Sequence, residues 1–343
     1  MGKLIKIALD TMGGDFGPEE TVAAAVQAAS DYNVGIQLVG DKNLVDAELL
    51  NYPEAKSLDI VVIPSDGVIY EHEQPAKAFR QKQHSSIVIA TQLVASNRSD
   101  ACVSMGSTGA AMTAAALIFG LMDGIERPAL GGPIIGLAPK TIIVDLGTNV
   151  DCKPSQLLSF AIIGEVFANI FWNISTPKVG ILSVGAEIGK GNKQVKETTE
   201  LLSSSGLNFI GNIEGNDLPT GSVDVVICDG FVGNIVMKLT EGLGAELSRH
   251  ITESLKGIID PKTAKVLEKE IFRVTNPVAN FGAGPLLGVN GISFIGHGKS
   301  RRDEIVSAIA TAKKTVERDF INQIQKRLSE TLSTLTKVET DER

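Results

Sequence analysis

Cysteine is scarce in this sequence of 343 residues, and its three cysteines, Cys102, Cys152 and Cys228, form no CxxC pair. An odd number of widely spaced cysteines argues against a disulfide framework and predicts buried free thiols. The amino terminus, MGKLIKIALD, lacks the apolar core and cleavage site of an export signal. We therefore expect a cytoplasmic protein in a reducing compartment.

Aromatic side chains, histidine and net positive charge are also in short supply. Aromatic residues make up 5% of the chain, and 32 basic against 40 acidic residues give a net charge of −8. This composition excludes base-stacking platforms and a global field for nucleic acid, so we expect no nucleic-acid partner. The four histidines show no HExxH or paired metal spacing, and GxSxG is absent. We expect no metal site and no hydrolase nucleophile.

The sequence also contains no complete nucleotide-binding motif. GAGPLLG at 282–288 has a GxG start but carries Pro285 and follows no predicted strand. GHGKS at 296–300 resembles the end of a Walker A loop, but the first glycine of that motif would fall on Ser293, inside a predicted strand. We therefore expect no cofactor.

Glycine, by contrast, is abundant, with 35 residues, and it follows short aliphatic runs. Such runs, apolar throughout, are typical of parallel strands buried on both faces. They are predicted at 5–9, 35–40, 59–64, 101–104, 141–147, 179–185, 223–230 and 291–298. Helical patterns between them, at about 18–30, 75–97 and 301–335 among others, predict a doubly wound, three-layer α/β/α fold with a mostly parallel sheet.

No linker composition marks a domain boundary, so we expect one α/β catalytic domain over residues 1–335 and a disordered tail over 336–343. Residues 101–122 are uncharged and long enough to span a bilayer. Their first half is rich in Gly, Ser, Thr and Ala, which favours a buried strand, a glycine turn and a helix.

Residues 245–275 are helical in composition, with no strand between their parts. Apolar residues recur on one face, and Lys262, Lys265, Lys269 and Arg273 line another. This pattern predicts a protruding amphipathic hairpin, either a solvated surface element or a contact with an anionic membrane or acidic partner.

Polar residues follow five of the predicted strands, where an α/β sheet binds ligands. SMGSTGAAM at 104–112 offers Gly106, Ser107, Thr108 and Gly109 to a phosphate, or Ser107 and Thr108 merely cap the next helix. The other turns contribute Asn149, Asp151, Lys153, Lys190, Asp229, Asn234 and His297. We expect these turns to converge on one crevice, which favours an enzyme over a binding module.

Several long motifs together resemble the acyl-ACP:phosphate acyltransferase (PlsX) family of bacterial phospholipid synthesis. They include LDTMGGDFGPE at 9–19, SMGSTGAAM at 104–112, ERPAL at 126–130, VDLGTNVDCKP at 144–154, VGILSVGAEIGKGN at 179–192, FIGNIEGNDL at 209–218, DVVICDGFVGNIVMK at 224–238 and PLLGVNGISFIGHGKS at 285–300. The resemblance covers residues 5 to about 309. One departure is GSTGA, where the family often has GNTGA.

The resemblance implies transfer of a long-chain acyl group from acyl carrier protein to inorganic phosphate, giving an acyl phosphate for a downstream glycerol-3-phosphate acyltransferase. It also implies a homodimer related in fold to isocitrate dehydrogenases and phosphotransacetylases, with no metal or cofactor, and peripheral membrane contact. The membrane residues would be Leu255, Ile258, Ile259, Leu267 and Ile271.

In that chemistry Lys190 would neutralise phosphate or polarise the thioester carbonyl, and Asn192 and Asn234 would donate to the oxyanion. His297 would assist proton movement. The residues that would order the substrate or these loops are Asp10, Gly13, Gly14, Asp15, Asn149, Lys153 and Asp229. Lys299, Arg301 and Arg302 would dock the acidic carrier protein.

Three other functions stay open. A phosphotransacetylase-like enzyme would use a short acyl-CoA and need no carrier protein. A dehydrogenase would need a nucleotide site, which the sequence does not contain. A catalytically silent scaffold would bind membranes but perform no chemistry.

Overall fold

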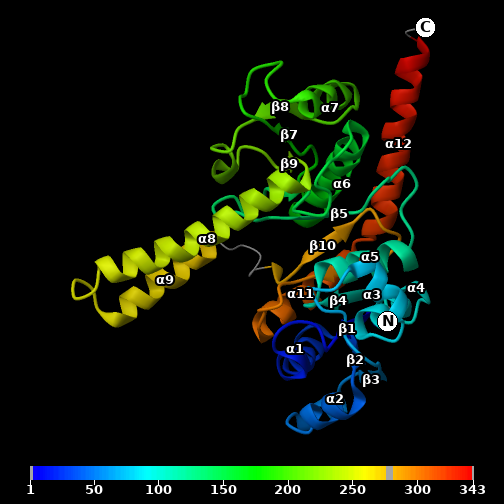
Figure 1. Ribbon diagram of the computed structural model, residues 1–343, viewed down its shortest axis with the longest axis vertical. Helices are drawn as coiled ribbons and strands as arrows, with labels where there is room; N and C mark the ends of the chain where they lie inside the picture. The colour runs from blue at the N-terminus through cyan, green and yellow to red at the C-terminus, as the bar shows by residue number, and fades with distance from the viewer. Residues whose placement is uncertain (1–2, 276–280, 342–343) are drawn as a thin grey trace. The chain divides into compact units, whose positions relative to one another are not determined.

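The computed structural model describes residues 3–275 and 281–341, with side chains to residue 334. The chain forms two compact units, coloured by sequence in Figure 1. Unit 1 comprises Met1–Met122 and Asn280–Ile321, and unit 2 comprises Asp123–Ala279 and Asn322–Arg343. A single catalytic domain over residues 1–335 stays a prediction.

Unit 1 is built on a sheet in which every strand except β10 is parallel to its neighbours. Its strands, in spatial order, are β3 (Ile60–Pro64), β2 (Gly35–Gly40), β1 (Lys6–Asp10), β4 (Ala101–Ser104), β11 (Ser293–Ile295) and β10 (Gly284–Leu287). The apolar runs of β1 and β4 are buried throughout, as expected of central parallel strands.

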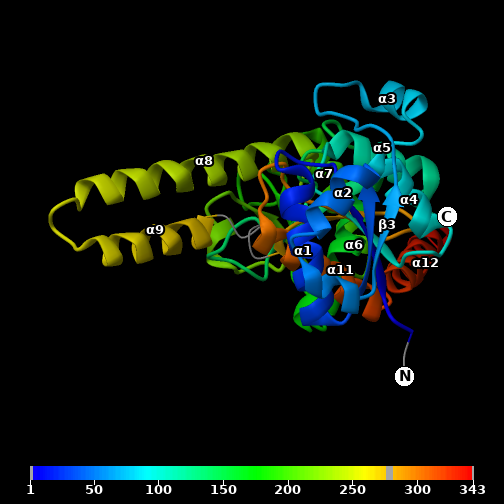
Figure 2. The ribbon, with the colours of Figure 1, turned by 90° about the horizontal axis from the view of Figure 1, so that it is seen from below.

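Helices cover both faces of this sheet. Its helical elements are α1 (Gly17–Tyr32), α2 (Lys42–Leu49), η1 (Pro53–Ser57), α3 (Pro75–Gln81), α4 (Ser86–Ala95), α5 (Thr108–Ile118) and α11 (Arg302–Glu317). Ile7 and Leu9 of β1 pack in the core formed with α1 and α11, whereas Ala8 packs with α4. Figure 2 shows α1 and α11 on the side of this sheet opposite α4.

The strands of unit 2 are again parallel to one another apart from one antiparallel strand, β5. Its strands, in spatial order, are β5 (Ala129–Gly132), β6 (Ile142–Val144), β9 (Val225–Ile227), β7 (Val179–Leu182) and β8 (Phe209–Ile213). Its helical elements are α6 (Pro154–Trp172), α7 (Lys193–Ser204), η2 (Leu218–Thr220), α8 (Gly230–Ser254), α9 (Pro261–Thr275) and most of α12 (Phe320–Asp341).

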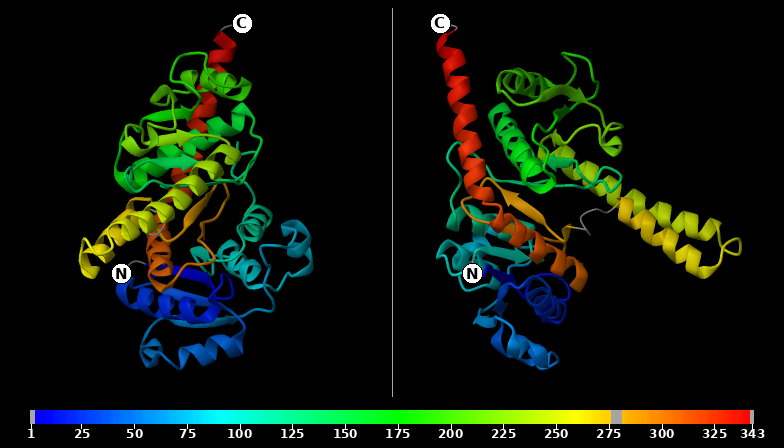
Figure 3. Two further views of the ribbon diagram at one scale, coloured as in Figure 1. Left: turned by 60° about the vertical axis from the view of Figure 1, so that its left-hand side comes forward. Right: turned by 180° about the vertical axis from the view of Figure 1, so that it is seen from behind.

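Helices cover both faces of the strands of unit 2 too. On one face α6 approaches β9 so closely that a Cβ at Gly164 would lie 2.4 Å from Val225 Cγ1. On the other face Ile143 and Val226 form a core with Val232 of α8. Figure 3 shows α12 alongside α6. The doubly wound, three-layer α/β/α class is therefore confirmed in each unit.

Helices α8 and α9 pack against each other as an antiparallel pair that extends away from the sheet of unit 2 (Figures 1 and 2). A Cβ at Gly244 would lie 2.1 Å from Thr275 Oγ1, so glycine is what allows α8 and the end of α9 to meet. The sequence predicted this hairpin from residue 245. The structure begins α8 at Gly230, directly after β9.

Several predicted elements differ from the structure. The helix predicted over 75–97 is two helices, because the Asp66 N–H donates to the His84 carbonyl and the chain turns between α3 and α4. The helix predicted over 301–335 is also two, broken where Asp319 adopts a left-handed conformation (φ 51°). Helix α12 continues to Asp341, whereas a disordered tail was predicted from residue 336. Strands β5, β8 and β10 were not predicted.

The uncharged segment 101–122 forms the buried strand β4, a glycine turn and α5, as predicted. Among the described residues, α6 is long and apolar enough to cross a membrane, but 78% of its apolar window is buried inside the protein. Helix α6 is thereby explained as a core helix.

Candidate functional site

In unit 1 the buried carboxylate of Asp10 organises the turns that follow β1 and β4. The Ser104 hydroxyl donates to Asp10 Oδ2 at 2.7 Å, and the N–H groups of Met12 and Gly13 donate to Oδ1 at 3.1 Å each. The Gly106 N–H donates in turn to Ser104 Oγ at 3.0 Å. Burial raises the pKa of Asp10, and these hydrogen bonds oppose the rise.

Glycine is required where these turns meet. A Cβ at Gly13 would lie 2.7 Å from the Gly106 nitrogen and 2.8 Å from Asp10 Oδ2, so the two backbones touch only because no side chain intervenes. Gly14 has a φ of +87°, and the adjacent Asp15 N–H donates to the Gly298 carbonyl at 2.7 Å. The turns after β1, β4 and β11 are therefore in contact with one another.

The predicted phosphate turn lies at the start of helix α5. Its N–H groups differ in whether they already have a hydrogen-bond acceptor. The Gly106 N–H already donates to Ser104 Oγ. Ser107 Oγ caps the helix by accepting from the Ala110 N–H at 3.3 Å. Ser107 thus caps the helix, and phosphate binding by this turn stays a prediction. The first turn of α5 holds no acidic residue, which leaves the positive end of the helix at Thr108 and Gly109. An anion would be favoured there.

Segment 65–86 packs against the same helix end. A Cβ at Gly109 would lie 2.6 Å from Pro75 Cγ, so α3 and the start of α5 fit together only with glycine at this position. Lys82 Nζ holds the segment by donating to Glu73 at 2.6 Å and to the Val68 carbonyl at 2.7 Å. The hydrogen bond from Lys82 lowers the pKa of Glu73.

The histidine and basic residues after β11 lie on the surface of unit 1. His297 and Lys299 are exposed. Arg301 forms an ion pair with Glu20 at 2.9 Å, and its guanidinium lies over the Phe16 ring, 3.3 Å from the centroid. These contacts fix the direction of Arg301.

Arg302 is held by the same carboxylate. Its N–H donates to Glu20 Oε2 at 2.8 Å, and its Nε donates to Gln27 at 2.6 Å. The predicted carrier-docking cluster is therefore partly neutralised by an acidic neighbour.

In unit 2 Asp145 has the role that Asp10 has in unit 1. It lies directly after β6, is fully buried, and accepts from the N–H groups of Leu130, Gly147 and Thr148 at 3.2 Å each. The Thr148 hydroxyl donates to Oδ2 at 2.7 Å, as does the Asn149 N–H. Asn149 also donates its side-chain amide to Asp145 and to the Pro128 carbonyl. The Asn149 side chain therefore orders the loop.

The start of α8 packs directly on this loop. The Gly230 N–H donates to the Asn149 carbonyl at 2.7 Å, and a Cβ at Gly233 would lie 1.8 Å from the Asp145 carbonyl oxygen. Asp229 caps α8 by accepting from the Val232 N–H at 2.8 Å, and burial raises the pKa of Asp229. The Asp229 side chain therefore acts as the N-cap of α8.

Asn234 lies in the first turn of α8, where it is exposed. A Cβ built at Gly147 would lie 3.3 Å from the Asn234 side-chain oxygen, so Asn234 lies against the Asp145 loop. An exposed amide beside a glycine backbone can donate to a ligand.

Lys190 and Asn192 belong to the turn between β7 and α7, and both are exposed. Asn192 caps α7, since its side-chain oxygen accepts from the Val195 N–H at 2.9 Å, which leaves its NH₂ group outward. Gln194, in the first turn of α7, donates to the Cys152 carbonyl at 2.6 Å. The turns after β6, β7 and β9 are thus joined within unit 2. Convergence of all five predicted turns stays a prediction.

Lys153 is the residue before α6, and it forms an ion pair with Glu126 at 2.9 Å. Ser155 donates to the same carboxylate at 2.7 Å. Both hydrogen bonds lower the pKa of Glu126, and the one from Ser155 has the larger effect. Lys153 therefore attaches the ERPAL segment to the start of α6.

The cysteines are free thiols, as predicted. Burial raises the pKa of Cys102 to about 11 and that of Cys152 to about 12, with Asp145 adding to the second rise. Burial also raises the pKa of Cys228. A thiol in this state is a poor nucleophile at neutral pH.

Leu255, Ile258 and Ile259 of the predicted membrane residues lie at the tip of the α8–α9 hairpin, whereas Leu267 and Ile271 lie further along α9. Ile258, at the tip, is 74% exposed, whereas Leu255, Ile259, Leu267 and Ile271 are half-buried. The apolar residues that α9 exposes most are Val266 and Phe272, which the sequence analysis did not select.

Sequence reasoning did not single out Asp145 or Asn212, although each lies inside a quoted motif. An aspartate directly after a buried strand and before Gly-Thr-Asn was the available signal for Asp145. Over residues 3–275 and 281–341, no group of three or more His, Cys, Asp or Glu residues could hold a metal ion.

Known proteins resemble this chain over most of its length. The model of a family described as "Fatty acid synthesis protein" matches residues 5–323. A phosphate acyltransferase of Pelotomaculum thermopropionicum is 44% identical over 324 residues, covering 94% of each chain. A phosphate acyltransferase of Elusimicrobium minutum is 38% identical over 341 residues, covering 98% of this chain and 99% of the relative.

Solved structures show the same fold. A phosphotransacetylase from Streptococcus pyogenes superimposes with a TM-score of 0.64 at 20% identity, covering 92% of this chain and 95% of its own. A branched-chain phosphotransacylase from Enterococcus faecalis gives a TM-score of 0.56 at 13% identity, covering 91% and 99%.

Proposed function

The chain belongs to the fatty acid synthesis protein family, and we propose that it transfers a long-chain acyl group from acyl carrier protein to inorganic phosphate. Family membership confirms the resemblance drawn from the motifs and makes the protein an acyltransferase. The product would be an acyl phosphate, which a glycerol-3-phosphate acyltransferase would consume in phospholipid synthesis. The observation that carries the proposal is the helix end at Thr108 and Gly109, because it is free of acidic residues and follows a buried strand.

The reaction suits a site without a protein nucleophile. Phosphate oxygen attacks the thioester carbonyl, a C–O bond replaces the C–S bond, and the carrier leaves as a thiolate that takes up a proton. The cysteine thiols, whose pKa values are raised, fit this scheme, since no thiolate is required of the protein. The protein must position a dianion and stabilise an oxyanion.

The proposed roles are those that the sequence predicted for these residues. In unit 1 the Ser107–Gly109 backbone would bind phosphate, with Gly106 shaping the turn through Ser104. In unit 2 Lys190 would supply positive charge to phosphate or to the thioester carbonyl. Asn192 and Asn234 would donate their outward amides to the oxyanion, and His297 of unit 1 would assist proton movement.

Carrier docking is proposed at Lys299, Arg301 and Arg302. Acyl carrier protein is acidic and this chain has a net charge of −8, so a local basic surface is needed. Reversing the charge of Arg301 and Arg302 should raise the apparent KM for the carrier and leave that for phosphate unchanged. An unchanged carrier KM would remove this surface from the proposal.

Peripheral membrane contact is proposed at the tip of the hairpin. Ile258 is exposed beside Lys256, and Lys262 and Lys265 follow on α9, which combines an apolar group with basic charge. Replacing Ile258 with Glu should reduce co-sedimentation with anionic phosphatidylglycerol vesicles. Binding equal to that of the unmodified chain would refute this assignment.

A homodimer is also proposed, and α8 offers a surface for it. Exposed apolar side chains recur at every fourth position of this helix, at Phe231, Ile235, Leu239, Leu243 and Leu247. A contiguous apolar stripe of this length is typical of an interface. Light scattering should give the mass of two chains, and a monomer at micromolar concentration would contradict the proposal.

The activity itself is tested with palmitoyl carrier protein, with and without inorganic phosphate, by following released carrier thiol and acyl phosphate. Phosphate-dependent release is expected. Turnover with acetyl-CoA and none with the carrier would instead indicate a phosphotransacetylase. No turnover with either acyl donor would favour a catalytically inactive scaffold. Lys190→Ala retaining normal turnover would remove the central role given to that lysine.

A further inference from the structure

The turn that carries Lys190 has little internal support. It runs from Ser183 to Asn192, and Gly189 and Gly191 adopt φ values of +85° and +101°. Its apolar side chains do not anchor it, since Val184 is 83% exposed and Ile188 is fully exposed. A turn with two left-handed glycines and no buried side chain at its tip depends on contacts from outside.

Asn212, in strand β8, supplies such a contact. Its side-chain nitrogen lies 3.3 Å from the Gly185 carbonyl oxygen, 3.3 Å from that of Glu187 and 3.2 Å from that of Lys190. One NH₂ group thus contacts three carbonyl oxygens of the turn. The Lys190 carbonyl is itself among the three.

The orientation of the amide is determined by its surroundings. The Thr199 hydroxyl lies 3.4 Å from Asn212 Oδ1. A flipped amide would place its oxygen against three carbonyl oxygens, none of which can donate a hydrogen bond to it. Donation from nitrogen to the turn is therefore the arrangement that the contacts favour.

The same turn directs the stem of the Lys190 side chain. A Cβ at Gly185 would lie 3.2 Å from Lys190 Cγ, so the stem lies directly over the Gly185 backbone. Asn212 holds Gly185 and Lys190 by their carbonyls at once. Any shift of the turn would move both the origin of the side chain and the surface on which it lies.

We propose that Asn212 is a positioning residue for Lys190 in acyl transfer to phosphate, an inference that rests on the function proposed above. Asn212 acts on the turn from a neighbouring strand and does not itself touch substrate. Its effect comes from fixing a flexible cation, and small displacements of such a group have large effects on rate.

Two substitutions separate positioning from packing. Asn212→Ala removes the donor that the Gly185 and Lys190 carbonyls share, while the Glu187 carbonyl still accepts from the Lys190 N–H. Asn212→Asp keeps the shape of the side chain but places carboxylate oxygens against those carbonyls. We expect the apparent KM for phosphate to rise about tenfold in Asn212→Ala and further in Asn212→Asp. A packing role predicts the reverse order, because Asp fills the same space as Asn.

Asn208 provides a matched control. It lies one residue before β8 and donates its side-chain amide to the Thr176 carbonyl at 3.1 Å, away from the Lys190 turn. Asn208→Ala should change the KM for phosphate by less than about twofold. Circular dichroism and thermal unfolding would show that each variant folds. If Asn212→Ala does not fold, Asn212→Thr, which suits a strand, replaces it.

A double-mutant cycle with Lys190→Ala tests whether Asn212 acts through the lysine. If it does, the double variant should be no slower than Lys190→Ala alone. Additive losses, or an Asn212→Asp variant as active as the unmodified chain, would overturn the inference. An unmodified chain inactive with carrier and phosphate would instead overturn the proposed function, so the two failures are distinguishable.

Discussion

Asp10 and Ser104 stand opposite each other in the register of two parallel strands, and their side chains are joined by a hydrogen bond of 2.7 Å. Each is the last residue of its strand, β1 or β4. The register therefore brings a buried carboxylate to the base of the turn that precedes α5. Through Ser104 the carboxylate also determines the direction of the Gly106 N–H.

Removing the Ser104 hydroxyl should disturb that turn. Ser104→Ala takes a donor from Asp10 and an acceptor from the Gly106 N–H, and we expect the KM for phosphate to rise about fivefold to tenfold. Ser293→Ala is the matched control, because Ser293 is also buried, on the adjacent strand, and contacts Cys102 at 3.3 Å instead. Equal effects of the two variants on this KM would contradict the role given to Ser104.

The raised pKa of Asp10 has a consequence for stability. Burial raises the pKa of this carboxyl above its ordinary value of 3.8, so the folded protein retains a proton that the unfolded chain releases. The contribution of Asp10 to the free energy of unfolding should therefore fall as the pH rises above about 3.8 toward the folded pKa.

Asp10→Asn, which does not titrate, should lose this decline. Urea unfolding of both proteins between about pH 4 and pH 7 measures the difference in slope. Parallel pH profiles would show that Asp10 does not retain its proton on folding.

Asp145 should be important for the stability of unit 2. Asp145→Ala leaves buried N–H donors of Leu130 and Asn149 without an acceptor, and we expect the free energy of unfolding to fall by about 3 kcal/mol or more. Asp151, exposed in the same loop, is the control, and Asp151→Ala should remain within about 0.5 kcal/mol. Denaturant unfolding monitored by circular dichroism compares them, and similar losses would contradict the assignment.

Two glycines of α8 should respond to alanine in opposite ways. A Cβ at Gly233 would lie 1.8 Å from the Asp145 carbonyl oxygen, so Gly233→Ala should separate α8 from its loop and destabilise by about 3 kcal/mol or more. Gly242 has no atom within 4 Å of such a Cβ. Gly242→Ala should stabilise by about 0.5–1 kcal/mol, as alanine favours a helix. Thermal unfolding of the two variants tests the contrast, and a shift of the same sign in both would refute it.

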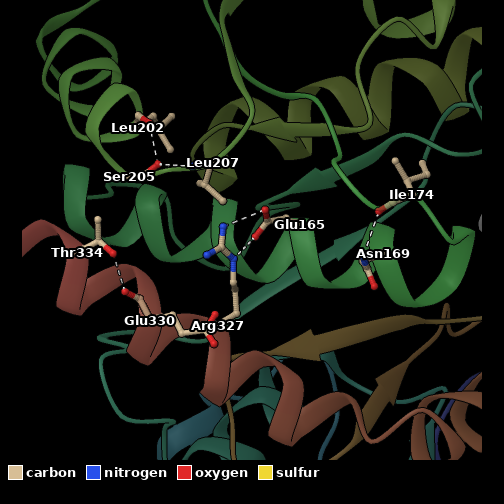
Figure 4. Close-up of polar contacts among 9 residues, drawn as sticks. All are labelled: Glu165, Asn169, Ile174, Leu202, Ser205, Leu207, Arg327, Glu330 and Thr334. Atoms are coloured by element: carbon tan, nitrogen blue, oxygen red, sulfur yellow. Dashed lines mark hydrogen bonds and ion pairs between the residues drawn. The ribbon is translucent and has the colours of Figure 1, made fainter.

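The attachment of α12 to α6 depends on Arg327 and Glu165. The guanidinium donates to both carboxylate oxygens, at 2.6 and 3.1 Å (Figure 4). The hydrogen bond to Glu165 raises the pKa of Arg327. The Glu165 side chain is 15% exposed, so Glu165→Ala should cost about 2 kcal/mol of stability.

The exposed pair of Arg249 and Glu246 is the control for that prediction. Glu246→Ala should change the free energy of unfolding by less than about 0.5 kcal/mol, because both partners are solvated. Urea unfolding measures both variants. A Glu165→Ala protein as stable as the unmodified chain would show that α12 is held by its apolar contacts alone.

Part of the site could be predicted from local sequence. The glycine turns after the strands, the cap at Ser107 and the helical hairpin all follow from residue types at short spacing, since turn chemistry and helix periodicity are local properties. Strands that are apolar throughout also indicate a parallel sheet, because only burial on both faces tolerates them.

Other features depended on residues far apart in the chain. Strands β5 and β10 each run antiparallel to the strand with which they pair in their unit, and Ala-Leu-Gly-Gly and Gly-Pro-Leu-Leu carry no strand pattern of their own. The break between α3 and α4 is explained by the bond from Asp66 to His84. Neither the hydrophobic pattern nor the helix propensity of the sequence indicates that contact.

The sequence by itself determined the fold class, the family and the order of the polar turns, because each is written in contiguous residues. Only the tertiary structure decided how those residues are used. It showed that the Gly106 N–H donates inward, that Arg301 pairs with Glu20, and that Asn212 gathers the carbonyls of the Lys190 turn. The physical reason is that a hydrogen bond depends on distance and direction in space, which strand register and packing fix between distant segments.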